Sequence, residues 1–213
     1  MNFPRTFVLT VRRPIKRFDE TVKHLDEQGI KWERFDGFDN QITRLNAKDS
    51  FDFDRAGERL ETKHVAATLT HYLLWKVMQY QPDDSFVALE FDVRFVEGWR
   101  ERYELAMRFL PRDWDLVYLG SCCCKGRETL PINMEIGSGG AGAIVPTGMF
   151  EVKYPLCGHA IMYRKKSLET LLDVHQKINM PLDIAMYHIS LPKLRVYTIL
   201  PRIVEQHATF LPP

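Results

Sequence analysis

The chain has 213 residues, of which 45% are hydrophobic and 27% are charged, as in ordinary globular domains. This composition excludes disordered, collagen-like and coiled-coil classes. The formal net charge of +1 argues against nucleic acid as the main partner, although a local basic patch stays open. No apolar run approaches the ~20 residues that span a bilayer, so we expect no transmembrane segment.

Apolar runs and helical periodicities alternate along the chain. Strands are expected at residues 7–11, 31–35, 86–89, 115–119, 159–163 and 195–199, and helices at 14–28, 61–80, 98–110, 166–178 and 182–188. The apolar stripe of the helix at 61–80 is expected on Val65, Leu69, Tyr72, Leu73 and Val77. This order predicts one α/β domain over residues 1–213, with a mostly parallel sheet.

Two stretches lack a recognisable catalytic or metal-binding spacing. Cys122, Cys123 and Cys124 are consecutive and Cys157 stands alone, which predicts reduced thiols and hence a cytoplasmic setting. The glycine-rich residues 137–148 carry neither the P-loop nor the dinucleotide pattern, and we expect a lid or a plain surface loop there. Motifs of serine hydrolases and zinc proteases are absent from the sequence.

Polar residues follow several predicted strands, where ligands bind in open α/β sheets. Glu90 and Asp92 are two residues apart, so both carboxylates can face one cleft and offer hard oxygen ligands to Mg²⁺ or Mn²⁺. The alternative is a pair of solvated acids that close the strand.

A basic cluster follows the first strand and straddles a helix start. Arginine forks beside helix amides suit a diphosphate, while the alternative is a solvated helix face. Its members are Arg12, Arg13, Lys16 and Arg17. His71, in the middle of a predicted helix, is either a ligand-binding residue or a half-buried packing residue.

The order of these segments resembles glycosyltransferase family 25, the lipooligosaccharide and collagen galactosyltransferase group involved in lipopolysaccharide biosynthesis and related glycosylation. The resemblance covers nearly the whole chain and is carried by eight short segments in the family's order. They are Thr10–Arg13 with Lys16-Arg17, Phe35–Asn40, Ala66–His71 with Leu74-Trp75, Leu89–Phe95, Trp114–Gly120, Gly158–Ala160 with Tyr163, Pro181–Asp183 and Pro201–Gln206. The sequence departs from the family at Phe91, which replaces the middle acid of an E-D-D triplet and so puts the metal dependence in doubt.

The resemblance implies a GT-A-type fold, a Rossmann-like α/β/α sandwich with a mostly parallel central sheet. It also implies an enzyme that transfers a hexose, galactose or glucose, from a UDP-sugar to a hydroxyl on a glycan or other acceptor. On this basis Arg13 and Arg17 would hold phosphates, Thr10 and Asp39 would line the nucleoside pocket, and His71 would anchor the donor.

The same resemblance implies a metal-assisted reaction. Asp92, with Glu90 directly or through water, would hold Mn²⁺ or Mg²⁺, and His207 could supply a further ligand. Asp183 is the candidate that orients or deprotonates the acceptor hydroxyl, and its alternative role is a helix cap after Pro181.

Two other functions are compatible with these residues. The first is a catalytically inert module that binds a nucleotide or glycan, with Phe91 as the trace of lost activity. The second is a phage-type enzyme that glycosylates DNA bases, for which arginines such as Arg94, Arg100 and Arg108 would have to gather on one face.

Overall fold

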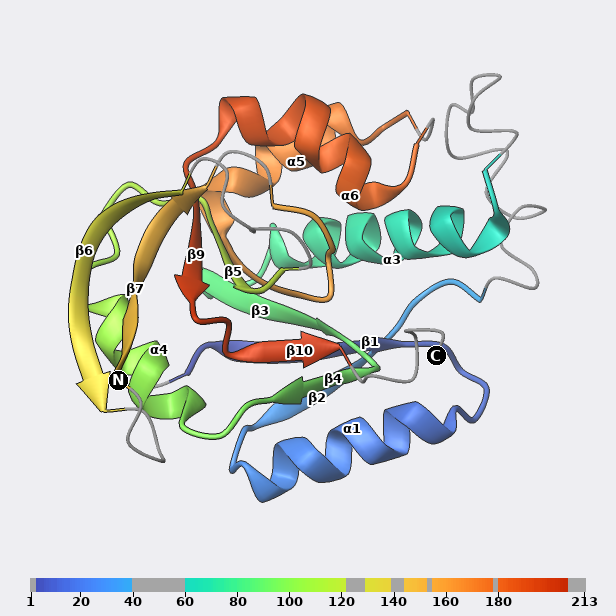
Figure 1. The fold of residues 1–213 in the computed structure, drawn as a ribbon. Helices are drawn as coiled ribbons and strands as arrows, with labels where there is room; N and C mark the ends of the chain where they lie inside the picture. The colour runs from blue at the N-terminus through green and yellow to red at the C-terminus, as the bar shows by residue number, and fades with distance from the viewer. Residues whose placement is uncertain are drawn as a thin grey trace.

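The computed structural model describes residues 3–39, 60–121, 129–138, 144–152, 155–177 and 180–206, and Figure 1 shows their arrangement. The strands are β1 (Arg5–Thr10), β2 (Trp32–Asp36), β3 (Ser85–Glu90), β4 (Val93–Phe95), β5 (Leu116–Gly120), β6 (Thr129–Ser138), β7 (Ile144–Val152), β8 (Ala160–Arg164), β9 (Val196–Leu200) and β10 (Val204–Gln206). The α-helices are α1 (Lys16–Glu27), α3 (Thr62–Met78), α4 (Trp99–Met107), α5 (Leu168–Val174) and α6 (Leu182–Ala185). Short 3₁₀ and π turns adjoin α5 and α6 at Lys165–Ser167, Met186–Ser190 and Leu191–Lys193.

The main sheet has the strand order β2-β1-β3-β8-β5-β9-β7-β6. β1 pairs in parallel with β2 and β3, and β5 pairs in parallel with β9, whereas β8 and β7 are antiparallel to their neighbours. All strands of this sheet except β7 and β8 therefore run in one direction. The expected α/β class with a mostly parallel sheet is confirmed.

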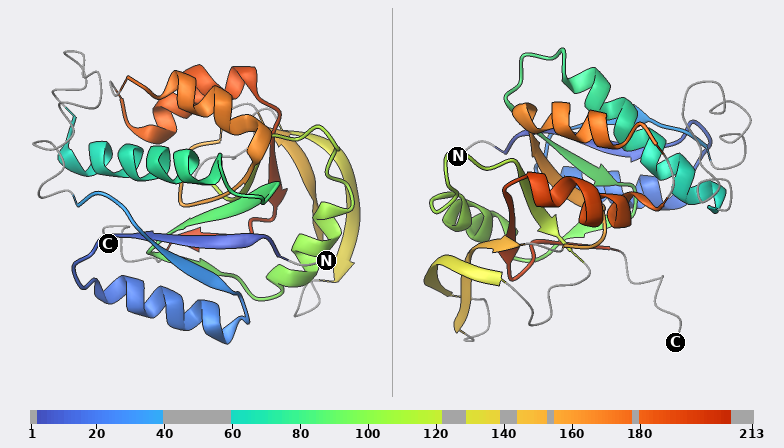
Figure 2. Two further views of the ribbon diagram at one scale, coloured as in Figure 1. Left: turned by 180° about the vertical axis from the view of Figure 1, so that it is seen from behind. Right: turned by 90° about the horizontal axis from the view of Figure 1, so that it is seen from above.

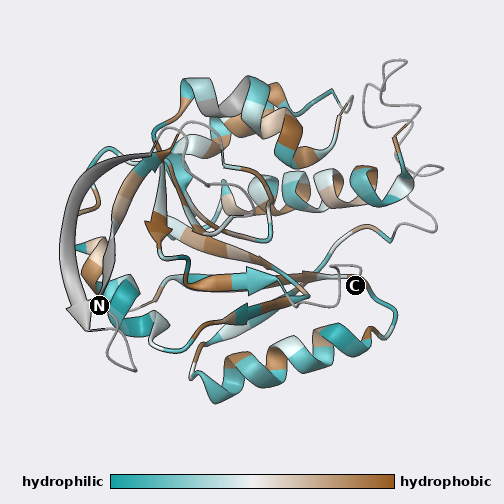
Figure 3. Cartoon of the chain, viewed as in Figure 1, coloured by the Kyte–Doolittle hydropathy of each residue, from teal (hydrophilic) through white to brown (hydrophobic). Residues whose placement is uncertain are grey.

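Helices cover both faces of the sheet, with α1 on one side and α3, α5 and α6 on the other (Figures 1 and 2). Alternation along β1 separates the two cores. Phe7 and Leu9 join the cluster beneath α3 and α5, and Val8 joins the cluster beneath α1 and α4. Figure 3 shows the hydrophobic colour gathered in the central strands.

Helix α3 is buried on more sides than a single amphipathic stripe predicts. Val65, Leu69 and Tyr72 are buried as expected, but Leu73 and Val77 are 37% and 40% exposed. Leu74, Trp75 and Met78 are buried instead and belong to the core shared with α5, α6 and the sheet. The prediction was wrong for Leu73 and Val77 because α3 packs against both the sheet and the neighbouring helices.

The glycine-rich stretch does not form the expected lid or surface loop in its described parts. Residues 129–138 and 144–152 form the antiparallel pair β6 and β7, which runs from Thr129 opposite Val152 to Ser138 opposite Ile144. β7 also pairs with β9, with Gly148 opposite Leu200. The pairing of β7 with β9 joins distant parts of the chain, so local composition could not reveal it.

The last described strand, β10, belongs to a second, two-stranded sheet. β10 pairs with β4, with Val204 opposite Phe95 and Gln206 opposite Val93. Gln206 consequently lies beside the segment that follows Asp92. Neither strand was predicted, because three residues are too few to show a period.

Candidate functional site

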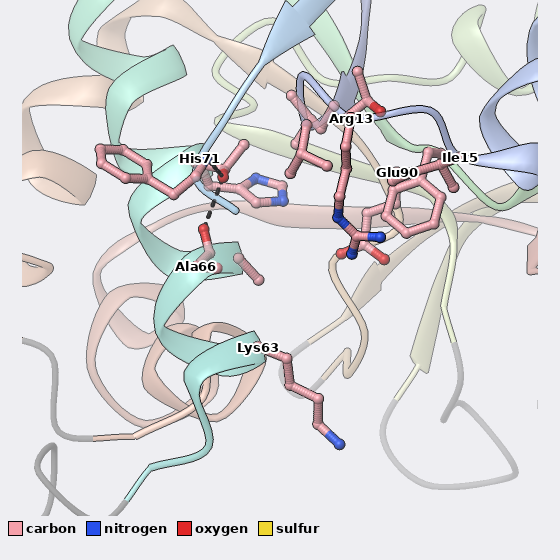
Figure 4. Close-up of a pocket in the computed structure, with 13 residues that line it drawn as sticks. Arg13, Ile15, Lys63, Ala66, His71 and Glu90 are labelled. Atoms are coloured by element: carbon pink, nitrogen blue, oxygen red, sulfur yellow. Dashed lines mark hydrogen bonds between the residues drawn. The ribbon is translucent and has the colours of Figure 1, made fainter. Parts of the chain in front are cut away.

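A cavity of about 220 Å³ lies between the carboxyl ends of β1 and β3 and the first half of α3 (Figure 4). We call it the β1 pocket. It is lined by Leu9, Thr10, Val11, Arg13, Ile15, Phe38, Lys63, Ala66, Ala67, Thr70, His71, Glu90 and Phe91. Carboxyl ends of parallel strands are the usual ligand edge of such sheets.

The β1 side of this pocket supplies a buried hydroxyl and a guanidinium group. Thr10 ends β1, is 4% exposed, and its Oγ1 has no hydrogen-bond partner among the described residues. Arg13 follows in the turn before α1, and its Nε donates to Asp39 Oδ2 at 2.9 Å. Asp39 thus orients Arg13 and does not itself line the pocket.

The segment after β2 is fixed against α3 by a close approach. Gly37 N–H donates to the Thr10 carbonyl oxygen at 2.8 Å, and Phe38 N–H donates to Thr70 Oγ1 at 3.0 Å. A Cβ on Gly37 would overlap the Thr70 side chain, so this contact needs glycine. Phe38 is thereby held in the wall of the pocket.

The α3 side supplies His71 and Lys63. His71 is 1% exposed, and burial, together with the charge of His175, lowers its pKa to about 3. The imidazole is therefore neutral at physiological pH. Lys63 lies in the first turn of α3 and its Nζ contacts Glu61 Oε2 at 2.7 Å.

Glu90 ends β3 and lines two cavities at once. Burial, reinforced by the charges of Asp92 and Asp183, raises the pKa of Glu90 to about 8. The side chain is consequently protonated at neutral pH unless a cation joins this group of acids.

The second cavity, of about 240 Å³, lies between α3 and the start of α6, and we call it the α6 pocket. It is lined by His64, Ala67, Glu90, Cys157, Gly158, Pro181, Leu182, Asp183 and Gln206. The two pockets share Ala67 and Glu90. A group bound at their junction would touch both.

Asp183 is positioned by backbone donors at the start of α6. Its Oδ1 accepts from Ile184 N–H at 2.9 Å and its Oδ2 accepts from Cys157 N–H at 3.4 Å. The alternative role as a helix cap was wrong, because Pro181 is the N-cap residue of α6, the helix has no side-chain capping hydrogen bond, and Asp183 lies in its first turn. Asp183 also lines the α6 pocket.

The structure gathers five predicted site residues at the two pockets, namely Thr10, Arg13, His71, Glu90 and Asp183. Asp92 is 5% exposed and lies near Glu90, but it lines neither pocket. Arg17 points from α1 and likewise lines neither. His207 lies outside the described residues.

Sequence reasoning missed Lys63, His64 and Gly158. Lys63 and His64 carry no local signal, because only the packing of α3 decides which of its turns faces a cavity. Gly158 precedes the antiparallel strand β8, whose beginning therefore lies at the same edge as the end of β3. The backbone pairing shows this directly, since Glu90 N–H donates to the His159 carbonyl oxygen at 2.8 Å.

The side chains at this edge could supply only some of the ligands that a divalent cation needs. Glu90 and Asp92 offer the oxygen ligands that Mg²⁺ and Mn²⁺ prefer, and their mutual repulsion would be relieved by a cation. Within the described ranges, however, no group of three or more His, Cys, Asp or Glu side chains could hold a metal. The remaining ligands would have to come from a bound diphosphate, from water or from residues outside those ranges.

The expectation of a reduced thiol was wrong for Cys157, because this residue is disulfide-bonded, while Cys122, Cys123 and Cys124 lie outside the described residues. Disulfides are rare in reducing compartments. The cysteines therefore give no support to the cytoplasmic expectation, which remains a prediction. Among the described residues, none of the helices is long and apolar enough to cross a membrane.

Comparison with known proteins gives a partial sequence match and no matching family model. The inactive glycosyltransferase 25 family member 3 of Mus musculus is 27% identical over 131 residues, which cover 56% of this chain and 22% of that protein. The chain is thus similar to family 25 glycosyltransferases. The probable inactive member 3 of Rattus norvegicus also matches at 27% identity over 131 residues. The chain spans about a fifth of the length of these relatives.

Two solved structures resemble the fold of this chain in part. A glycosyltransferase involved in the glycosylation of the major capsid of PBCV-1 has a TM-score of 0.48 at 12% identity, covering 92% of this chain and 81% of that one. HddC from Yersinia pseudotuberculosis, complexed with GMP-PN, has a TM-score of 0.39 at 12% identity, covering 96% and 93%. Because neither TM-score reaches 0.5, these likenesses carry no functional inference.

Proposed function

We propose that the protein is a glycosyltransferase that moves a hexose from a UDP-sugar to a hydroxyl group on a glycan or similar acceptor. One observation carries the proposal. The β1 pocket and the α6 pocket meet at Glu90, so a donor in the first would present its sugar to an acceptor in the second. The sequence similarity to family 25 glycosyltransferases supports the same reaction class.

The donor would bind in the β1 pocket. Arg13 and Lys63 bring positive charge to opposite elements of its wall, which suits a diphosphate (Figure 4). Thr10 offers a buried hydroxyl without a hydrogen-bond partner in the described chain, and such a group gains from a polar ligand. Apolar side chains, Phe38 and Ile15 among them, give the nucleoside a surface to pack on.

A divalent cation would be held by Asp92, with Glu90 directly or through water. When bound, Mn²⁺ or Mg²⁺ neutralises the charge that develops on the diphosphate leaving group. Glu90 would give up its proton on binding, because a carboxylate must be ionised to ligate a metal. His207 stays a proposed further ligand.

Asp183 would act on the acceptor. Backbone N–H groups of Ile184 and Cys157 hold its carboxylate in place, and one face of it opens into the α6 pocket. It can accept the proton of an acceptor hydroxyl as that oxygen attacks the sugar carbon.

The experiment that tests this function is calorimetric titration of UDP, GDP and CMP, with and without Mn²⁺, into wild type and Asp92→Asn. We expect UDP to bind with Mn²⁺ and to lose most of its affinity in the variant. Asp173→Asn, which removes an exposed carboxylate on α5, serves as the matched control. Failure of all three nucleotides to bind wild type would contradict the proposal.

The second candidate is a catalytically inert module of the same fold that binds a nucleotide or glycan. The curated relatives are named inactive, and Phe91 lines the β1 pocket where the family has an acid. A screen for UDP-sugar hydrolysis separates the two. Nucleotide binding without any hydrolysis or transfer would favour the inert module.

A further inference from the structure

The two ring nitrogens of His71 face different surroundings. Nδ1 lies 3.4 Å from the hydroxyl of Tyr163, and Nε2 has no hydrogen-bond partner among the described residues. The imidazole lines the β1 pocket, and a Cβ placed on Gly158 would lie 3.9 Å from both Nε2 and Glu90 Oε1. Nε2 is thus directed to the junction of the two pockets.

Tyr163 is held rigidly behind His71. It lies on β8, is fully buried, stacks on Phe86 with ring centroids 5.3 Å apart, and meets the Trp75 ring edge-on at 5.8 Å. Because Trp75 is one turn after His71 on α3, the same helix that carries the histidine fixes the tyrosine ring. Tyr163 does not itself line the β1 pocket and reaches it only through His71.

The chemistry of the neighbours favours one direction for the Tyr163–His71 hydrogen bond. Burial raises the pKa of Tyr163 well above its usual value, so the phenol keeps its proton. The indole N–H of the neighbouring Trp75, which can only donate, partly offsets this rise in the pKa of Tyr163. Beside this donor, the Tyr163 hydroxyl oxygen acts as an acceptor. Its own O–H is then left to donate to His71 Nδ1.

We propose that Tyr163 is a positioning residue that donates to His71 Nδ1 and so fixes the imidazole as the Nε2–H tautomer. The proton on Nε2 then points to the junction of the pockets, where it donates to an oxygen of the bound nucleotide sugar. The tautomer of a histidine is set by the hydrogen bond that its other nitrogen makes. The ligand contact rests on the proposed function, whereas the tautomer does not.

The tautomer is tested by nitrogen-15 NMR of the imidazole rings, with His71 assigned by comparison with His71→Gln. We expect the wild-type ring proton on Nε2, and a shift toward the Nδ1–H form in Tyr163→Phe. Tyr103→Phe is the matched control, since it removes a buried hydroxyl from the core on the other face of the sheet. A proton on Nδ1 in wild type, or an unchanged ring in Tyr163→Phe, would overturn the proposal.

The ligand contact is tested by titrating UDP-galactose and UDP-glucose into the same proteins. Tyr163→Phe should weaken binding of the better ligand by about tenfold and Tyr103→Phe should not, as expected for one hydrogen bond. His71→Gln, which keeps a donor near the Nε2 position, should bind better than His71→Asn. Equal binding by all variants would overturn the contact. Failure of wild type to bind either sugar nucleotide would overturn the proposed function and the contact with it, and the NMR result would still decide the tautomer.

Discussion

Glu90 and Asp183 come from distant parts of the chain and line the same pocket, and the charge of Asp183 contributes to the raised pKa of Glu90. β3 delivers the first residue and α6 the second. Their proximity joins the cavity at the end of β1 to the cavity beside α6, and this junction is where the proposed transfer would take place.

Arg13 and Arg17 belong to one basic cluster in the sequence, but only Arg13 lines the β1 pocket. We therefore expect Arg13→Gln to weaken UDP binding by about tenfold, the effect of losing one charge-assisted hydrogen bond. Arg17→Gln is the matched control and should bind within a factor of about two of wild type. Calorimetry measures the UDP affinity of both variants. An equal loss of affinity in the two would mean that the phosphates bind beside α1 and not in the β1 pocket.

The proton on Glu90 makes folding stability depend on pH. The folded protein keeps this proton up to about pH 8, whereas the unfolded chain releases it near its ordinary pKa of 4.5. Between these values the folded state binds more protons, so this group lowers the free energy of unfolding as pH rises. Glu90→Gln removes the effect, and its stability relative to wild type should increase from pH 4.5 to pH 8 and stay constant above that.

Denaturant unfolding of the two proteins at a series of pH values measures this difference. Each unit of pKa shift corresponds to roughly 1.4 kcal/mol, so the expected change is well above the error of the method. A stability difference that stays constant across the range would show that Glu90 ionises normally.

Asp183→Asn should separate donor binding from transfer. The amide keeps the size of the side chain and can still accept from Ile184 N–H, but it cannot take a proton from an acceptor. We expect UDP affinity within about twofold of wild type and a fall in transfer of about 100-fold or more. If UDP affinity falls and transfer by the saturated enzyme persists, Asp183 binds the donor instead.

Gly120 ends β5 at a point where the chain of β10 crosses closely. A Cβ there would overlap the Val204 carbonyl oxygen and His159 Nε2. Gly120→Ala should lower the free energy of unfolding by about 1–3 kcal/mol, as overpacking does. Gly158→Ala is the control, because its Cβ would meet Leu182 at an ordinary 3.5 Å, and we expect a change within about 0.5 kcal/mol.

The sequence predicted the elements whose burial follows a local period. β1, β3, β5, β8 and β9 are short apolar runs, and α1 ends at Glu27, close to the expected boundary and two residues before Gly29, whose φ is 65°. The sequence did not predict β4 and β10, which are too short to show a pattern. It also did not predict β6 and β7, which are defined by their pairing with each other and by the pairing of β7 with β9.

For the site, the sequence by itself determined which polar residues follow strands, and Thr10, Arg13 and Glu90 were found in this way because chain order places them at strand ends. Only the tertiary structure decided which of the predicted residues meet. It brought His71 and Asp183 to Glu90, gave Lys63 a place in the pocket wall and left Arg17 and Asp92 outside the lining. The physical reason is that a side chain faces a cavity through the packing of its helix or strand against distant partners, and that packing has no local signature.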